Sequence, residues 1–303
     1  MSLPTDHDAR IERARLSLEG LSLGDAFGER YFGHPHTIDQ LIADRALARA
    51  PWKWTDDTAM ALSVVEVLER HGGIDEDALA HAFARRYRQE PVRGYGGGAH
   101  QILGALGQGV PWSVAARMVF DGQGSMGNGG AMRVAPVGAY FADDLDRTVE
   151  HAARSAVVTH AHPDGQAGAI AIAVAAAFAW QTAHGGAARD GTALLETALA
   201  RTPAGPTHDG IASAIDFPRT NDVKDAAARL GNGSHVISSD TVPLALWCAA
   251  RHLDDFEEAM WITVSALGDR DTTCAIVGGI VALSVGQAAL PAEWLRSREP
   301  LSG

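Results

Sequence analysis

Apolar residues recur at intervals of three and four along almost the whole chain, the spacing that places them on one face of an α-helix. Alternating apolar and polar residues, the pattern of a half-buried strand, are hard to find. The chain is therefore predicted to be all-α and compact. The predicted helices cover residues 8–24, 56–70, 75–90, 99–107, 112–120, 131–141, 145–159, 165–184, 192–201, 208–215, 222–230, 241–252, 255–266, 272–287 and 291–296.

Breaks rich in glycine and proline separate these helices, but none is a long flexible linker and no fixed-period repeat is present. A single domain over residues 1–303 is therefore predicted. The longest apolar stretch, residues 167–180, is rich in alanine and shorter than a bilayer span, so we expect a buried core helix and no membrane segment. The charged N-terminus lacks the apolar core of a signal peptide, and Cys248 and Cys274 lie in apolar helical runs. These features favour a cytoplasmic location.

The charge of the chain narrows the class of partner. Its 303 residues include 25 Lys and Arg against 37 Asp and Glu, which gives a net charge of −12. No cluster of basic residues offsets this excess, so nucleic acid is not an expected partner. An anionic ligand would need a metal ion or backbone N–H groups to bind.

Thr55, Asp56, Asp57 and Thr58 stand in a row at the start of the helix predicted over residues 56–70. Acidic and hydroxyl side chains are common there, because a helix N-terminus carries unpaired N–H groups and a partial positive charge. Capping accounts for one threonine and one aspartate. It leaves the second carboxylate unexplained, so a simple cap and a functional cluster both stay open.

A second acidic cluster, Asp269, Asp271, Thr272 and Thr273, opens the helix predicted over residues 272–287. Together the two clusters offer hard oxygen ligands, which suit Mg²⁺ or Mn²⁺ and do not suit zinc or copper. If the clusters face each other, their carboxylates repel strongly unless cations lie between them. Two cations about 3.5–4 Å apart would relieve that repulsion and provide a reaction centre. Periodicity alone does not show that the clusters face each other.

A third stretch, residues 122–130, contains five glycines and leads into the helix predicted over 131–141. Glycine lets the backbone approach a ligand closely, and the N–H groups of a loop entering a helix can bind an anion. The spacing of Gly124 and Gly127 and the lack of a preceding strand do not match a dinucleotide-binding fingerprint. The loop is predicted to bind phosphate, with a plain flexible loop as the alternative.

These stretches belong to a set of short motifs through which the chain, from about residue 16 to 288, resembles the ADP-ribosylglycohydrolase family. That family includes the enzyme that reactivates ADP-ribosylated dinitrogenase reductase. The motifs follow the family's order and cover most of the chain. They are GLSLGDAFG at 20–28, WTDDT at 54–58, YGGG at 95–98, GSMGNGGAMR at 124–133, THAHPDGQAGAIA at 159–171 and GDRDT at 268–272.

The resemblance implies an orthogonal all-helical bundle with two Mg²⁺ or Mn²⁺ ions at the bottom of a cleft. Asp25 falls on the signature aspartate of the first motif, where a supporting role and direct contact are both open. The implied metal ligands are Thr55, Asp56, Asp57, Asp269, Asp271 and Thr272. The implied ADP-ribose-binding residues are Ser125, Gly127, Asn128 and Gly129 of the glycine loop, together with His160.

The resemblance further implies hydrolysis of a ribosyl bond at the anomeric carbon, which releases ADP-ribose from a modified protein or small molecule. Asp56 or Asp57 would accept the proton of the attacking water, whose pKa falls near the cations. Phe32 stands where many members carry a glutamate, and Glu29 or Glu90 could replace that acid. Without it, we expect arginine-linked ADP-ribose to be cleaved faster than serine-linked, because a neutral guanidine leaves directly whereas an alkoxide must be protonated.

Two other interpretations stay open. A metal phosphohydrolase of the His-Asp type is conceivable, since His7-Asp8 and His208-Asp209 occur, but it leaves the acidic clusters unexplained. A catalytically inactive ADP-ribose-binding protein on the same scaffold is the other alternative. Such a protein would be expected to have lost metal ligands, and all six matched positions still carry oxygen. An enzyme, an ADP-ribosylglycohydrolase, is therefore favoured.

Overall fold

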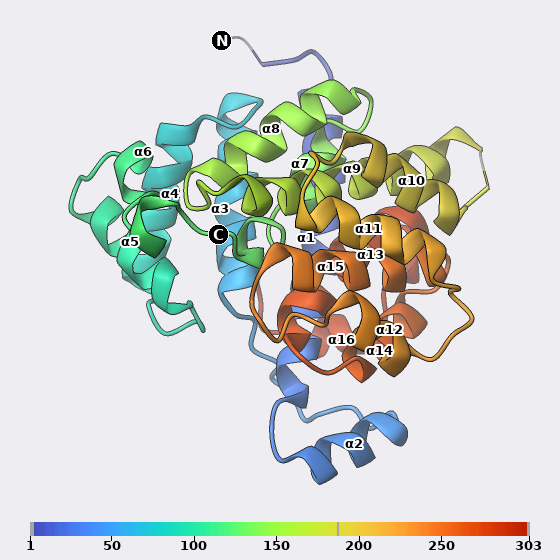
Figure 1. The fold of residues 1–303 in the computed structure, drawn as a ribbon. Coiled ribbons are helices and arrows are strands. Elements are labelled where there is room, and N and C mark those ends of the chain that lie inside the picture. Colours follow the sequence, from blue (N-terminus) through green and yellow to red (C-terminus); the bar gives the residue numbers. More distant parts are fainter. Residues whose placement is uncertain (1–2, 187, 302–303) are drawn as a thin grey trace.

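Helices account for nearly all regular structure in the computed structural model, which describes residues 3–186 and 188–301 (Figure 1). Within those residues the only β pairing is two isolated bridges, Trp52 with Arg298 and Gly127 with Ile237. The prediction of an all-α protein is confirmed. The α-helices are α1 (His7–Gly28), α2 (Pro35–Ala43), α3 (Asp56–His71), α4 (Glu76–Gln89), α5 (Gly97–Gly107), α6 (Trp112–Ala115), α7 (Ala135–Tyr140), α8 (Leu145–Val157), α9 (Pro163–Gly185), α10 (Gly191–Arg201), α11 (Pro206–Asp216), α12 (Val223–Leu230), α13 (Ser238–Arg251), α14 (Phe256–Ser265), α15 (Arg270–Val285) and α16 (Ala292–Ser297). The 3-10 helices are η1 (Glu29–Tyr31), η2 (Phe120–Gly122), η3 (Asn128–Gly130) and η4 (Gln287–Ala289).

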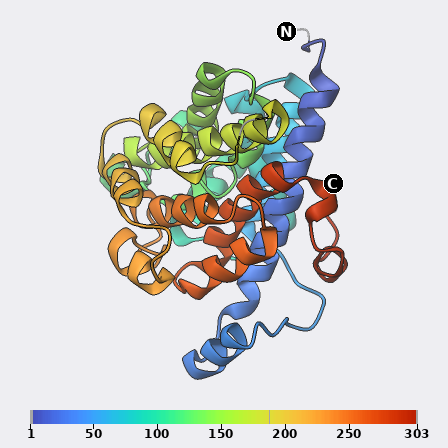
Figure 2. The ribbon, with the colours of Figure 1, turned by 90° about the vertical axis from the view of Figure 1, so that its right-hand side faces the viewer.

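The long helix α1 packs closely against α15, and glycines allow the approach (Figure 2). A Cβ on Gly24 would lie 2.0 Å from the carbonyl oxygen of Cys274, and one on Gly28 would lie 2.2 Å from that of Arg270. No side chain fits at these distances, so only glycine permits the contact. The glycines of the first motif therefore bring the C-terminal end of α1 against the start of α15, which carries Asp271.

Helix α9 lies in the core and contacts α7, α8, α10, α13 and α15. A glycine of α7 allows one of these close contacts, since a Cβ on Gly138 would lie 2.0 Å from the carbonyl oxygen of Ala173 in α9. Length and composition alone would allow α9 to cross a membrane, but 72% of its most apolar window is buried inside the fold. The prediction that residues 167–180 form a buried core helix is confirmed.

Helix α2 and its flanking loops project from the main body, at the bottom of Figures 1 and 2. The sequence pattern did not predict this helix. Of its residues only Ile38 is buried, and the helix is only nine residues long, so Ile38, Leu41 and Ile42 give a single repeat of the helical spacing. Pro35 stands at its first position, where the fixed φ of proline suits a helix start.

Two helices are much shorter than predicted, each by five residues. The helix expected over residues 112–120 ends at Ala115, because the chain turns and Phe120 adopts a φ of 54°. The helix expected over 131–141 begins only at Ala135, because the glycine loop continues into η3 and a turn. Apolar spacing extends across both turns, which is why periodicity overestimated these lengths.

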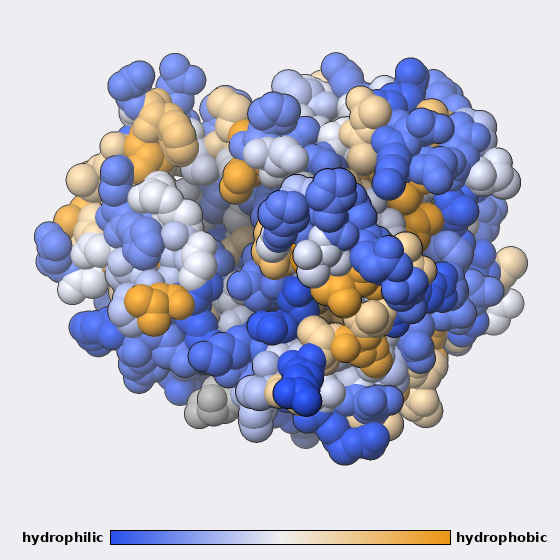
Figure 3. Space-filling model, turned by 90° about the horizontal axis from the view of Figure 1, so that it is seen from below, coloured by the Kyte–Doolittle hydropathy of each residue, from blue (hydrophilic) through white to orange (hydrophobic). Residues whose placement is uncertain are grey.

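The surface is mainly hydrophilic on the face shown in Figure 3, where apolar side chains form small separate groups. Among the large apolar side chains that are exposed, Phe120 and Met126 flank or belong to the glycine loop. The loop therefore offers apolar surface as well as backbone polar groups.

Candidate functional site

The two acidic clusters face each other at the N-termini of α3 and α15. The hydroxyl of Thr272 lies 3.5 Å from Oδ2 of Asp57. Burial raises the pKa of Asp57 well above its ordinary value, and the nearby charges of Asp25 and Asp271 raise it further. The structure therefore brings together the carboxylates that periodicity alone could not place.

Asp25, near the end of α1, lies beneath the first cluster and is fully buried. Its carboxylate accepts hydrogen bonds from the backbone N–H groups of Thr55 at 2.9 Å and Thr58 at 3.1 Å. It also accepts from both threonine hydroxyls. A carboxylate from α1 thus holds the start of α3, while Thr55 itself caps that helix by accepting from the N–H of Asp57. Of the two roles left open for Asp25, the geometry assigns the supporting one.

One hydroxyl group in this cluster lies within hydrogen-bond distance of two carboxylates. Oγ1 of Thr55 lies 2.9 Å from Oδ1 of Asp25 and 3.0 Å from Oδ2 of Asp57. A hydroxyl carries a single hydrogen, so it donates to only one of these oxygens. Each oxygen also has a second donor nearby, the N–H of Thr55 at 3.1 Å for Oδ1 of Asp25 and the hydroxyl of Thr272 at 3.5 Å for Oδ2 of Asp57.

Burial makes four carboxylates of the site, those of Asp25, Asp56, Asp57 and Asp271, difficult to ionise. It raises the pKa of Asp25 to about 6 and that of Asp56 to about 7. It also raises the pKa of Asp271 well above its ordinary value, and the charge of Asp269 adds to the effect. A divalent cation among these groups would reverse the shifts, because it stabilises their charged forms.

The oxygen atoms of the site fit such a cation. Oδ1 of Asp57 and Oδ1 of Asp271 are buried and have no hydrogen-bond partner among the described residues. Leaving such atoms unpaired is costly. With the hydroxyls of Thr55 and Thr272 they offer the all-oxygen donors that Mg²⁺ and Mn²⁺ prefer. Within residues 3–186 and 188–301, no group of three or more His, Cys, Asp or Glu side chains is arranged so that it could hold a metal ion.

The glycine loop, residues 122–130, lies against the second acidic cluster. Nδ2 of Asn128 donates to Oδ2 of Asp269 at 2.7 Å. A Cβ on Gly127 would lie 3.3 Å from Nε2 of His160, so this histidine borders the loop. The loop and the carboxylates therefore belong to one site.

Contacts within the loop fix its shape. The N–H of Gly127 donates to Oγ of Ser125 at 3.0 Å, and the N–H of Ser238 in α13 donates to the carbonyl of Met126 at 3.0 Å. A Cβ on Gly129 would lie 2.9 Å from Cε1 of the His160 ring, closer than real Cβ contacts. Ser125, Gly127, Asn128, Gly129 and His160 thus lie together, as the resemblance implied.

A C-terminal segment, residues 297–301, contacts residues 52–54, which lead into α3. The sequence did not predict this contact. The N–H of Glu299 donates to the carbonyl of Trp52 at 2.9 Å. The carboxylate of Glu299 accepts from the N–H of Trp54 at 3.2 Å and pairs with Arg93. These partners are more than 200 residues apart in sequence, so no local pattern signals the contact.

Arg93 connects this segment to the first acidic cluster. Its backbone oxygen accepts from the N–H of Asp56 at 2.7 Å, and its guanidinium lies 3.5 Å from the ring centre of Trp54. Next to it, Gly94 has a φ of 94° and a Cβ there would lie 3.4 Å from Oδ1 of Asp56. The ion pair of Arg93 with Glu299 therefore holds the loop that covers Asp56.

Glu299→Gln is expected to lower the free energy of unfolding by about 1–3 kcal/mol, because it weakens a charge-assisted bond in a largely buried position. A matched control is Glu69→Gln, which removes the charge from the exposed pair with Arg15. That change is expected to cost less than about 1 kcal/mol. Denaturant unfolding of both variants measures the two values, and equal costs would contradict the role given to Glu299.

Phe32 lies beside the second acidic cluster. Its ring is exposed and packs 4.8 Å from the guanidinium of Arg270, which donates to the carbonyl of Tyr31. Of the two acids that could replace the missing glutamate, Glu90 is paired with Arg93 at 2.6 Å. Glu29 is half-buried, which raises its pKa. Glu29 therefore stays the better candidate.

The His-Asp pairs of the rival interpretation do not form a metal site. His7 bonds through Nδ1 to the hydroxyl of Tyr140 at 2.8 Å. His208 lies 3.2 Å from Asp209, whose side chain is exposed. Neither pair contacts the acidic clusters, so the geometry gives the phosphohydrolase interpretation no support.

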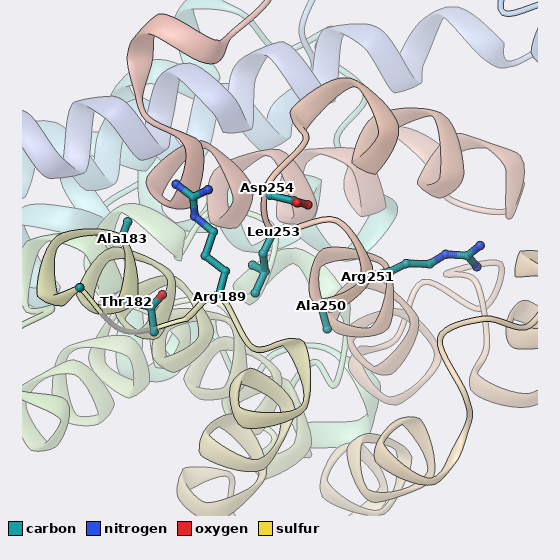
Figure 4. Close-up of a pocket in the computed structure, with 8 residues that line it drawn as sticks. Thr182, Ala183, Arg189, Ala250, Arg251, Leu253 and Asp254 are labelled. Carbon is teal, nitrogen blue, oxygen red and sulfur yellow. The ribbon is translucent and has the colours of Figure 1, made fainter.

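A separate cavity of about 540 Å³ lies between the end of α9 and the end of α13 (Figure 4). Arg189 and Arg251 line it, but each guanidinium donates to a backbone carbonyl, that of Ser284 at 2.9 Å and that of Asn221 at 2.7 Å. None of the predicted site residues lies there. The cavity is distinct from the acidic site.

The structure is thus an all-α fold in which two acidic helix starts meet beside a glycine loop. The chain belongs to the ADP-ribosylglycohydrolase family, whose model matches residues 6–301. It is therefore a glycohydrolase, and the predictions of this family and of an enzyme are confirmed.

Similar proteins agree with this assignment. The ADP-ribosylhydrolase ARH3 of Homo sapiens is 30% identical, over 95% of this chain and 90% of that protein. The ADP-ribosylarginine hydrolase Tri1 of Pseudomonas putida is 25% identical, over 94% of this chain and 74% of that protein. A solved structure described as an ADP-ribosylglycohydrolase-related protein complex has a TM-score of 0.65 at 23% identity, covering 96% of this chain and 94% of that chain, which supports the fold.

Proposed function

We propose that this chain is a metal-dependent hydrolase that removes ADP-ribose from a modified acceptor by cleaving the ribosyl bond at the anomeric carbon. The observation that carries the proposal is the 2.7 Å contact between Asn128 and Asp269. It joins a loop suited to phosphate with carboxylates suited to a divalent cation. The names of the relatives, two kinds of ADP-ribosyl hydrolase, support the same substrate class.

The unpaired buried oxygens of Asp57 and Asp271 support the metal part of the proposal. Two Mg²⁺ or Mn²⁺ ions, when bound, supply positive charge that orients sugar hydroxyls and lowers the pKa of a nearby water. The residues that would hold them are Thr55, Asp56, Asp57, Asp269, Asp271 and Thr272.

Asp56 and Asp57 differ in solvent exposure, and we assign them different roles on that basis. Asp57 is buried, whereas Asp56 is partly exposed beneath Gly94. Asp56 is therefore the carboxylate placed to accept a proton from the attacking water. The water oxygen bonds to an oxocarbenium-like anomeric carbon, the bond to the acceptor breaks, and the acceptor leaves with the electron pair.

Gly127→Val is expected to weaken ADP-ribose binding much more than Mg²⁺ binding. The new Cβ would lie 3.0 Å from Oγ of Ser125 and 3.3 Å from Nε2 of His160, so valine crowds the space between loop and histidine. Gly104→Val, where a Cβ meets nothing within 4 Å, is the matched control. Calorimetry with ADP-ribose and with Mg²⁺ separates the effects, and equal losses of both would mean that the loop supports only the fold.

Arginine-linked ADP-ribose is expected to be hydrolysed with a higher kcat/KM than serine-linked, because Phe32 supplies no acid to protonate an alkoxide. Phe32→Glu is expected to narrow the gap. Phe32→Gln removes the aromatic ring without adding an acid and is the control. Kinetics on matched peptides measure the ratio of the two kcat/KM values. A higher kcat/KM for the serine-linked peptide in the wild type would show that another acid, with Glu29 as the main candidate, protonates the leaving alkoxide.

The proposal is tested by incubating the protein with Mg²⁺ or Mn²⁺ and peptides of defined ADP-ribosyl linkage, then measuring free ADP-ribose. We expect release that a chelator stops. Binding of ADP-ribose without any release would favour the inactive scaffold. Phosphate release without ADP-ribose would favour a phosphohydrolase.

A further inference from the structure

Three buried polar side chains form a line from the core to the glycine loop. A guanidinium N–H of Arg133 donates to Oγ1 of Thr159 at 2.8 Å, and Oγ1 of Thr159 lies 2.8 Å from Nδ1 of His160. The same arginine nitrogen donates to the carbonyl of Ser155 at 2.9 Å. All three side chains in the line are buried.

Arg133 forms no ion pair among the described residues, although, against the larger opposing effect of burial, the charge of Asp56 raises its pKa. Its guanidinium lies 4.5 Å from the ring centre of Phe83 and one nitrogen lies 3.5 Å from the sulfur of Met60. Burial lowers the pKa of Arg133 to about 9, so it still carries its proton at neutral pH. It acts only as a hydrogen-bond donor, since arginine has no acceptor.

The hydroxyl of Thr159 is therefore the acceptor in its bond with Arg133. Its own hydrogen has no other acceptor within hydrogen-bond distance in the described part of the chain than Nδ1 of His160. If Nδ1 carried a hydrogen, the threonine hydroxyl would be a buried donor without an acceptor, which costs free energy. The arrangement that gives both the Thr159 hydroxyl hydrogen and Nδ1 of His160 a partner has the threonine donating to Nδ1.

His160 is neutral in this environment. Burial and the charge of Arg133 lower its pKa to about 3. A neutral imidazole has one N–H, so with Nδ1 accepting, the hydrogen resides on Nε2. Nε2 lies 3.3 Å from where a Cβ on Gly127 would be and 3.1 Å from where one on Gly129 would be, so it points at the glycine loop.

We propose that Arg133 and Thr159 are positioning residues that fix His160 in its Nε2–H tautomer, so that it presents a neutral N–H donor to an oxygen of ADP-ribose in the glycine loop. The identity of the ligand rests on the proposed function. The assignment also excludes His160 as a general base or a metal ligand, because its one free lone pair already accepts from Thr159.

The tautomer is measured without ligand, by long-range ¹H–¹⁵N NMR of the full-length protein labelled at histidine. His160→Gln identifies the signal. His151 is an internal control, because its Nδ1 accepts from the backbone N–H of Ile74 at 3.0 Å and must also be the Nε2–H form. We expect the His160 ring to show the same pattern as His151 at neutral pH. An Nδ1–H pattern or a charged ring would overturn the proposal.

The effect on binding is measured by calorimetry with ADP-ribose. Thr159→Val is expected to weaken binding about two- to tenfold, the loss of one hydrogen bond, while Mg²⁺ binding stays unchanged. Thr159→Ser keeps the hydroxyl and is expected to restore the wild-type affinity and tautomer. An unchanged affinity in Thr159→Val, or an equal loss in both variants, would overturn the proposal. If the wild type fails to bind ADP-ribose, the proposed function fails, and the NMR pattern still decides the tautomer.

Discussion

Replacing Asp57 by asparagine is expected to lower kcat/KM at least ~10³-fold, which corresponds to a loss of about 4 kcal/mol of transition-state stabilisation. The same variant is expected to have a higher Tm than the wild type when both are measured in a chelator near pH 8. Activity falls because a buried oxygen that fits a cation is replaced by an amide. Stability rises because the charge of Asp57 is buried beside Asp25, Asp56 and Asp271, whose charges oppose its ionisation. When a residue serves the active site at a cost in stability, replacing it is expected to lower the activity and to raise the Tm.

Asp75→Asn is the matched control for that experiment. Asp75 caps α4 by accepting from the N–H of Ala78 at 2.8 Å, and it lies outside the acidic site. Because asparagine caps helices as well as aspartate does, this variant is expected to change neither activity nor Tm appreciably. Loss of activity in both variants, or a lower Tm in Asp57→Asn, would contradict the account of the site.

Stabilisation by Mg²⁺, measured as the difference in Tm between Mg²⁺ and chelator, is expected to grow as the pH rises from about 4 to 7. The pKa values of Asp25 and Asp56 are raised from 3.8 to about 6 and about 7. In chelator the folded protein therefore binds more protons than the unfolded chain in this window, and its stability falls as the pH rises. A bound cation replaces those protons, so its contribution is largest where the protons have left.

Three histidines act in the opposite direction and must be separated from this effect. Burial lowers the pKa of His151 to about 4 and that of His160 to about 3, and it also lowers the pKa of His252, so their contributions to stability rise with pH up to the ordinary histidine value of 6.5. All three contributions are the same with and without Mg²⁺ and cancel in the difference. Thermal unfolding across this pH range in both solutions gives the result; a difference that does not change with pH would mean that the carboxylates do not bind the cation.

The sequence predicted the parts of the site that are local in the chain. Each acidic cluster is visible in the sequence as a run of carboxylate and hydroxyl side chains before an apolar stretch with helical spacing. The glycines of residues 122–130 identify the loop. The family resemblance then placed these segments together, and the structure brings Asp57, Thr272, Asn128 and Asp269 into contact as expected. The all-helical class followed from the 3.6-residue period alone.

The parts that the sequence did not reveal depend on contacts between distant segments. Asp25 could not be assigned a role, because its hydrogen bonds from the four N–H and O–H groups of Thr55 and Thr58 exist only once α1 lies against α3. Glu299 carries no local signal of its pairing with Arg93. Helix α2 was not predicted because its nine residues contain only a single repeat of the helical spacing, Ile38, Leu41 and Ile42.

The claim that two distant acidic segments form one metal centre is tested most directly by anomalous scattering from crystals grown with Mn²⁺. We expect two manganese peaks between the N-termini of α3 and α15, bonded to oxygens of Asp57 and Asp271, and loss of at least one of them in Asp57→Asn crystals. Wild-type crystals with no manganese at this position, or with manganese bound only elsewhere, would contradict the claim.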